Sequence, residues 1–139
     1  MPYPFIIAGK NPSAVIKKEV AKNPNVKLIE NPSHEEMLTL IKNAHINLLN
    51  TFQYSGIKLK LLNSLYNGRF CVVNSKMIES TGLESACMIE DNPNLTKKII
   101  AALMNKPFTD TEIVQRKLLL ENHYDIQPMA QQIIAGIWG

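Results

Sequence analysis

Five residues that could take part in chemistry lie close together in the chain: Ser55, Gly56, Lys58, Lys60 and Asn63. The apolar pattern predicts an amphipathic helix from about Ile57 to Tyr66, directly after the glycine. A glycine that leads into a helix leaves free backbone N–H groups, and these suit an anion such as a phosphate. Lysines in a first helical turn are unfavourable for the helix dipole, so a bound anion would explain Lys58 and Lys60.

Simpler explanations exist for the same side chains. The lysines could form a solvated helix face, or their stems could cover apolar neighbours. Because Lys58 and Lys60 are two positions apart, they point in different directions and cannot easily reach one ligand. We therefore expect Lys60 to be exposed. Asn63 interrupts an apolar helix face, where its amide could bond a ligand hydroxyl or a backbone group.

The elements that would position these residues alternate between strand and helix. Strands are predicted at Tyr3 to Ala8, Val26 to Glu30, Ile46 to Leu49, Phe70 to Val73 and Ala86 to Glu90. No hairpin dipeptide separates them, which favours a parallel, doubly wound α/β fold. The prediction is one Rossmann-like sheet of about five strands with helices on both faces, its first strand buried on both sides. From Asn94 onward the tail should be helical.

Helix-start signals support this order of elements. Asn-Pro-Ser occurs twice, at residues 11–13 and 31–33, and Ser33 with Glu36 fits a capping box. Thr109 with Glu112 is a second candidate box, and Asp125 should cap the last helix. These signals place the loops at the carboxyl ends of the strands, where an open parallel sheet binds its ligands.

Three more candidate residues lie at such strand ends. Gly9 and Lys10 could approach and neutralise a phosphate, although a glycine after a strand is also ordinary turn chemistry. Glu30 could contact a base or a sugar, or could be a solvated carboxylate. A site would have to be assembled from these loops.

Length and composition set the broad class. A chain of 139 residues suits a single domain, 1–139, with a sizeable core. The net charge of +3 is scattered along the chain and argues little for nucleic acid. No apolar run approaches membrane-spanning length, and the N-terminus has no signal-peptide pattern. We expect a cytoplasmic protein whose membrane contact is at most peripheral.

Other reactive residue types form no recognisable catalytic set. Cys71 and Cys87 are expected inside buried strands, as free apolar side chains, with a reactive or disulfide role as the alternative. Their spacing predicts no metal site. The three histidines lie in unrelated contexts, which argues against a hydrolytic triad and leaves the catalytic residues unknown.

Several segments in order resemble a known family: FIIAG, VKLIENPSHEEMLTLIKNAHINLLNT, SGIKLKLLNSLYNGRFCVVN and ACMIEDNPNLTKKIIAALM. Their order and spacing are similar to the C-terminal, donor-binding domain of retaining GT-B glycosyltransferases of family four. The resemblance covers the chain to about Asn105. It implies binding of a nucleoside diphosphate sugar as substrate, with no cofactor and no metal in the chemical step. The glycosyl group would pass to a glycan, lipid or small molecule, as in cell-surface polysaccharide biosynthesis.

The resemblance also assigns roles by position. The amides of Gly56 and Ile57 would hold the diphosphate, Lys60 would match a lysine seen in some relatives, and Asn63 would contact the ribose. Ser55 stands where the family has a glutamate that contacts the donor sugar, and a serine supplies no carboxylate.

The family also has parts that this sequence does not show. Its acceptor-binding N-terminal domain, and one strand and helix that open its donor domain, have no counterpart here. We therefore expect this chain alone to bind donor weakly without turnover, and to need the acceptor domain as a partner; a homo-oligomer is also compatible. The alternative is a noncatalytic α/β interaction module with a decayed nucleotide site, since Ser55 and Asn63 replace acids.

Overall fold

The computed structural model describes residues 3–50 and 59–123. The chain divides into two compact units, Met1–Thr39 and Leu40–Gly139, and each is described by itself. The single domain expected for residues 1–139 therefore stays a prediction.

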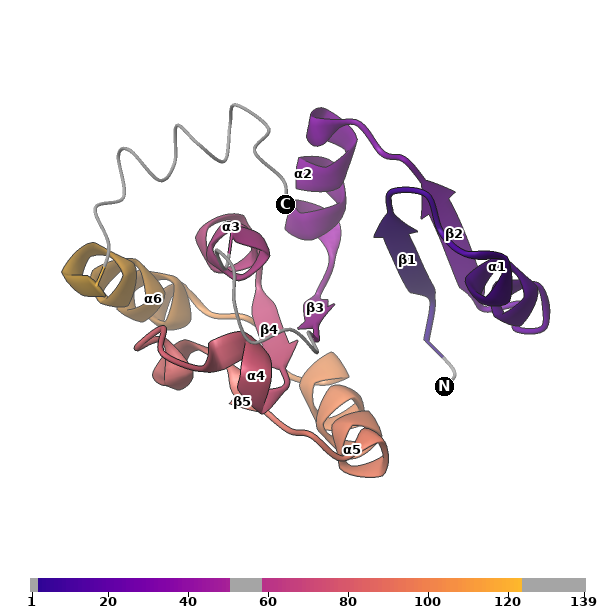
Figure 1. Cartoon of the computed structure of the whole chain (residues 1–139). Coiled ribbons are helices and arrows are strands. Elements are labelled where there is room, and N and C mark those ends of the chain that lie inside the picture. Colours follow the sequence, from indigo (N-terminus) through magenta and orange to yellow (C-terminus); the bar gives the residue numbers. More distant parts are fainter. Residues whose placement is uncertain (1–2, 51–58, 124–139) are drawn as a thin grey trace. The chain divides into compact units, whose positions relative to one another are not determined.

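The first unit is a parallel βαβ arrangement (Figure 1). Strand β1 (Phe5–Gly9) leads through helix α1 (Ala14–Ala21) to strand β2 (Val26–Glu30), and helix α2 (His34–Asn43) begins in this unit. The strands pair in parallel, with Phe5 opposite Val26 and Gly9 opposite Glu30. The carboxyl ends of the two strands therefore lie side by side.

The two Asn-Pro-Ser segments shape these carboxyl ends in the same way. Asn11 and Asn31 both have left-handed backbones, with φ of 46° and 50°, which asparagine tolerates better than most residues. The backbone N–H of Asn11 donates to the side-chain Oδ1 of Asn31 at 2.9 Å, which links the two turns. The predicted capping box is confirmed: Glu36 N–H donates to Ser33 Oγ at 3.1 Å, and Ser33 N–H donates to Glu36 Oε1 at 3.2 Å.

The second unit contains a three-stranded parallel sheet in the order β3-β4-β5. Its elements are β3 (Ile46–Leu49), α3 (Leu59–Asn67), β4 (Phe70–Val73), α4 (Ser75–Ile78), a 3-10 helix η1 (Glu84–Ala86), β5 (Met88–Ile89), α5 (Pro93–Met104) and α6 (Asp110–His123). The register places Ile46 opposite Phe70, and Val72 opposite Met88.

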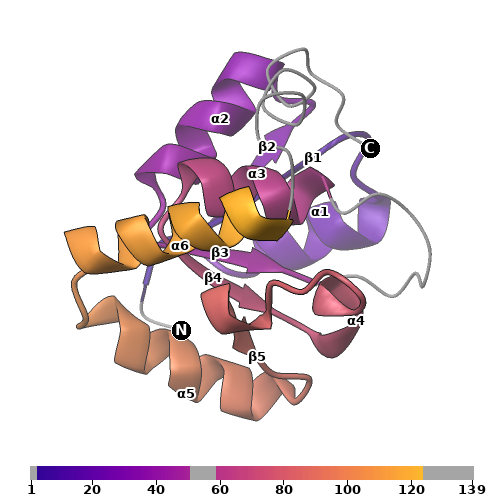
Figure 2. The same ribbon diagram turned by 90° about the vertical axis from the view of Figure 1, so that its left-hand side faces the viewer.

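Helices cover both faces of this sheet (Figure 2). Side chains of β4 alternate between two apolar clusters, as expected for a strand buried on both sides. Phe70 and Val72 pack with Leu103 of α5, whereas Cys71 and Val73 pack with residues of α3 and with Leu120 of α6. The prediction of an α/β fold with helices on both faces is confirmed for this sheet. The tail contains helices α5 and α6, with a non-helical connection at residues 105–109, and the predicted cap Asp125 lies outside the described residues.

Three fold predictions need correction. The described strands form two sheets, of two and three strands, rather than one sheet of about five. Alternating strands and helices predict parallel direction, but they do not specify which strands become neighbours. The first strand is not buried on both faces, since Ile6 is 49% exposed. The fifth strand is shorter than expected, because Glu84–Ala86 forms η1 and leaves Cys87 just before β5.

A buried arginine ties α6 to the sheet. Nη1 of Arg116 donates to the backbone carbonyls of Gly68 and Arg69, and Nη2 donates to the carbonyl of Ala86 at 3.4 Å. Its guanidinium carbon also lies 4.7 Å from the ring centroid of Phe108. Arg116 thus joins the segment before β4 to the end of η1.

Candidate functional site

The start of the predicted phosphate site falls outside the described part of the chain. This applies to Ser55, Gly56, Ile57 and Lys58, whose predicted roles stay predictions. The described helix α3 begins at Leu59, so the site can be built only from Lys60 and Asn63 on this side.

Asn63 is a buried polar residue on α3, with a side chain 1% exposed. Leu61 and Leu65 of the same helix pack into the core below. The Oδ1 atom of Asn63 accepts a hydrogen bond from Nδ2 of Asn67. Within the described residues its own Nδ2 is buried without a hydrogen-bond partner. A buried amide N–H without an acceptor is uncommon and unfavourable, so this atom is suited to a ligand acceptor.

Lys60 is exposed, as expected. The ion pairs found within residues 3–50 and 59–123 join Lys17 to Glu30, Lys22 to Glu19 and Lys106 to Glu112. None of these pairs includes Lys60. The first turn of α3 therefore presents an ammonium group that no described carboxylate neutralises.

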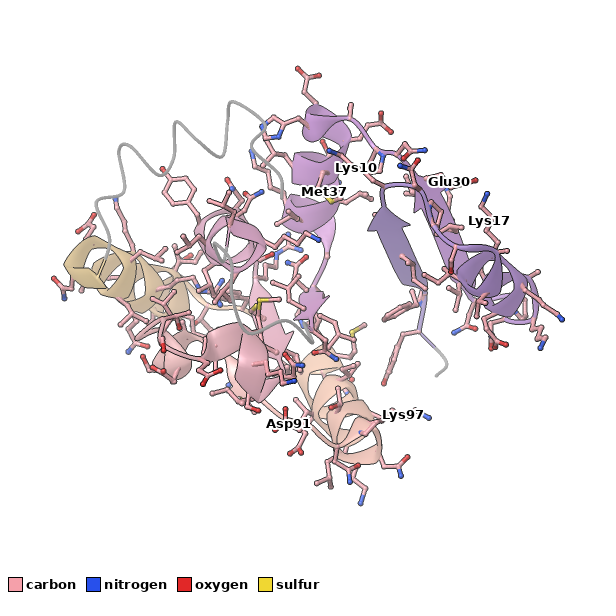
Figure 3. The ribbon with its side chains drawn as sticks, in the orientation of Figure 1. Lys10, Lys17, Glu30, Met37, Asp91 and Lys97 are labelled. Atoms are coloured by element: carbon pink, nitrogen blue, oxygen red, sulfur yellow. The ribbon has the colours of Figure 1, made fainter. Side chains whose placement is uncertain are left out.

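In the first unit, the structure brings Gly9, Lys10 and Glu30 together at the carboxyl edge of the β1-β2 sheet. Figure 3 labels Lys10 just beyond β1 and Glu30 at the end of β2. Glu30 Oε1 lies 3.0 Å from Nζ of Lys17 on α1, so this carboxylate already has a cationic partner. A Cβ atom added at Gly9 would meet no atom within 4 Å, which leaves the backbone there open to approach.

A hydrogen-bonded pair at the carboxyl edge of the second sheet was not predicted. Asp91 accepts from the Ser75 amide at 2.8 Å and from the Ser75 hydroxyl at 2.7 Å, which joins the ends of β4 and β5. These two bonds, the amide one first, hold the pKa of the Asp91 carboxyl below its ordinary value. Both residues were recognisable as strand ends, but their pairing depends on β5 lying beside β4.

The Asp91 carboxylate should make the stability of the fold decrease at acidic pH. Since its pKa is depressed in the folded chain, it stabilises the fold above the ordinary aspartate pKa of about 3.9, and this contribution is lost as pH falls through the lower folded value. We expect Asp91→Asn to lower the Tm at pH 7 and to differ less from the unmodified chain near pH 3. Thermal unfolding by circular dichroism across this range is the measurement. If the difference in Tm between Asp91→Asn and the unmodified chain does not change with pH, the Asp91 carboxylate does not stabilise the fold in this way.

No group of three or more His, Cys, Asp or Glu side chains within residues 3–50 and 59–123 could hold a metal ion. None of the helices in these ranges combines the length and apolar character that crossing a membrane requires.

Comparison with known proteins gives no relative from which a function could be transferred. No protein-family model matches the chain, and neither the curated proteins nor the solved structures contain a match.

Proposed function

We propose that this chain is the donor-binding domain of a glycosyltransferase, and that it binds a nucleoside diphosphate sugar. The observation that carries the proposal is the buried, unpaired Nδ2 of Asn63 on the helix that follows β3. In parallel α/β sheets, the helix after a strand starts at the ligand-binding edge. An amide N–H one turn into such a helix is suited to a ribose hydroxyl oxygen.

The charge at the start of α3 supports the same class of ligand. Lys60 is exposed and has no acidic partner among the described side chains, and α3 has no acidic residue in its first turn. A diphosphate carries the negative charge that such a helix start favours. The amides of Gly56 and Ile57 remain the expected direct contacts to that diphosphate. In the transfer step, these groups would stabilise the leaving diphosphate without a metal ion.

Two substitutions on α3 test the assignment. Asn63→Leu removes the buried donor and the side-chain acceptor of Asn67, whose Nδ2 keeps the Asn63 backbone carbonyl at 3.2 Å. We therefore expect little change in Tm and a loss of the thermal stabilisation given by a UDP-sugar or GDP-sugar. Lys60→Ala should weaken binding by roughly threefold to tenfold, the range typical of one partly screened charge contact. The measurement is the Tm as a function of nucleotide-sugar concentration.

A lysine on the opposite side of the sheet provides the matched control. Lys97 is exposed on α5 (Figure 3), so Lys97→Ala changes the net charge equally without touching α3. Its binding should equal that of the unmodified chain. If Lys60→Ala and Lys97→Ala lose equal nucleotide-sugar affinity, the loss comes from the overall charge and not from a contact at Lys60. If Asn63→Leu binds as well as the unmodified chain, the Asn63 amide does not contact the ligand.

A further inference from the structure

The two cysteines lie near each other at the second sheet: Cys71 is on β4, and Cys87 is the extended residue directly before β5. Strands β4 and β5 are parallel, with Val72 opposite Met88, and each cysteine directly precedes one residue of this pair. Continuing the register by one residue places Cys71 opposite Cys87. Cys71 belongs to the apolar cluster on the α3 and α6 face, and Cys87 packs against the same cluster. Cys71 is fully buried and Cys87 is partly buried.

Neighbouring strands in a sheet lie about 4.8 Å apart, and the Cα atoms of a disulfide are usually about 4.4–6.8 Å apart. The backbone spacing of Cys71 and Cys87 is therefore suited to a disulfide without movement of the strands. Both side chains must also leave the sheet on the same face, and their packing in the same apolar cluster meets this condition.

Arg116 places a positive charge beside this pair. Its guanidinium donates to the carbonyl of Ala86, the residue just before Cys87, and to the carbonyl of Arg69, two residues before Cys71. Hydrogen bonding with the Cys71 thiol and the charge of Arg116 lower the pKa of Cys87, although burial opposes this shift. The same hydrogen bond and burial raise the pKa of Cys71. The two thiols are thus made unequal by their surroundings.

We propose that Cys71 and Cys87 form a redox-active thiol pair, a modification site that peroxide converts into an intrachain disulfide. The partly buried Cys87 thiolate attacks one oxygen of hydrogen peroxide, the O–O bond breaks, and the released hydroxide takes a proton to become water. Cys87 is then a sulfenic acid. The sulfur of Cys71 attacks the sulfenic sulfur, an S–S bond forms, and the departing hydroxide takes the Cys71 proton. The sum is two thiols and one peroxide giving one disulfide and two waters.

The roles of the two cysteines follow from burial. The oxidant must reach the more accessible sulfur, which is that of Cys87, whereas Cys71 at 2% exposed is protected until its neighbour is oxidised. Arg116 acts as a positioning residue that favours the Cys87 thiolate. An inert buried pair, packed only as small apolar side chains, is the alternative that the experiment must exclude.

The test uses the folded full chain treated with one equivalent of hydrogen peroxide, followed by thiol blocking and trypsin. Cleavage after Arg69, Lys76 and Lys97 separates the cysteines into two peptides, 70–76 and 77–97. We expect loss of both free thiols and a linked pair of these peptides that a thiol reductant separates. Unlinked peptides, or a linkage between different chains, would overturn the proposal.

Single-cysteine variants assign the order of events. In Cys71→Ser, the sulfenic acid at Cys87 should persist and be trapped by dimedone. In Cys87→Ser, the folded chain should give no adduct at Cys71, although the urea-unfolded chain should react. Circular dichroism confirms that each variant is folded. In the unmodified chain, the rate of thiol loss to peroxide should rise through a lower pH midpoint when the chain is folded than when it is unfolded. Equal dimedone trapping at both cysteines of the two single variants would contradict the assigned roles.

Discussion

Replacing Arg116 by methionine should lower the free energy of unfolding by about 2–4 kcal/mol. The guanidinium satisfies three backbone carbonyls, those of Gly68, Arg69 and Ala86, at the junction of α6 with β4 and η1. Methionine fills similar space but leaves these acceptors without their donor, and each buried unpaired group costs about 1–3 kcal/mol. The loss in free energy of unfolding stays below the sum for three unpaired carbonyls, because the methionine variant no longer carries the cost of burying a charged group.

Arg116→Lys is the matched control for this result. Lysine keeps the positive charge, but its single ammonium lacks the planar fork that reaches separate carbonyls. We expect an intermediate loss of about 1–2 kcal/mol. Urea unfolding followed by circular dichroism measures both variants. If Arg116→Met loses less than about 0.5 kcal/mol, the range of an ordinary surface substitution, the structural role given to this arginine is wrong.

Gly68→Ala should lower the free energy of unfolding by about 1–3 kcal/mol, the usual range for forcing extra atoms into a packed site. Gly68 lies between α3 and β4, where an added Cβ would meet Asn47 Nδ2 at 2.5 Å and the Ser64 carbonyl oxygen at 2.7 Å. The Ser64 carbonyl accepts from the Gly68 amide, so it cannot move freely away. The Asn47 side chain is held by the Ile41 carbonyl at 3.3 Å.

Gly9→Ala provides the contrasting substitution. An added Cβ there would meet nothing within 4 Å, so stability should change by less than about 0.5 kcal/mol. Urea unfolding of both variants makes the comparison. Equal losses at Gly9 and Gly68 would mean that the close packing at Gly68 is not the cause.

Local patterns predicted the elements of this fold well. The capping box at Ser33, the strands at Val26 to Glu30 and Ile46 to Leu49, and the buried strand at Phe70 to Val73 all follow from short-range signals. Such signals depend on neighbours in the chain, so they survive without knowledge of the tertiary structure. The division into two sheets depends on which strands pair, and a strand's own residues do not specify its partner.

The apolar residues of α6 predict its buried face only in part: Leu120 is in the core, but other apolar side chains are not. Ile113, Val114 and Leu118 are more than half exposed, whereas the charged Arg116 is 9% exposed. An amphipathic pattern assigns the inner face by hydrophobicity, and here a cation lies inside because backbone carbonyls of distant segments face it. The hydrogen bond between Ser75 and Asp91 could not be predicted either, because it also joins segments that are distant in the sequence.

The candidate site was predictable in part. Asn63 drew attention as a polar residue in an apolar helix face, and the structure adds that it is buried with an unpaired nitrogen. Exposure of Lys60 was also expected from its position on the helix. Glu30 was predicted as a ligand contact or a solvated carboxylate, and its pairing with Lys17 depended on the packing of α1 beside β2.

The most direct test of donor binding is calorimetric titration of the unmodified chain with UDP, GDP, UDP-glucose and GDP-mannose. We predict saturable binding at one site per chain for at least one of the two nucleotides, with the matching nucleotide sugar competing for that site. Asn63→Leu should abolish this heat while remaining folded. If a folded chain gives no heat of binding with any of the four ligands, the proposed function is contradicted and a noncatalytic interaction module is favoured.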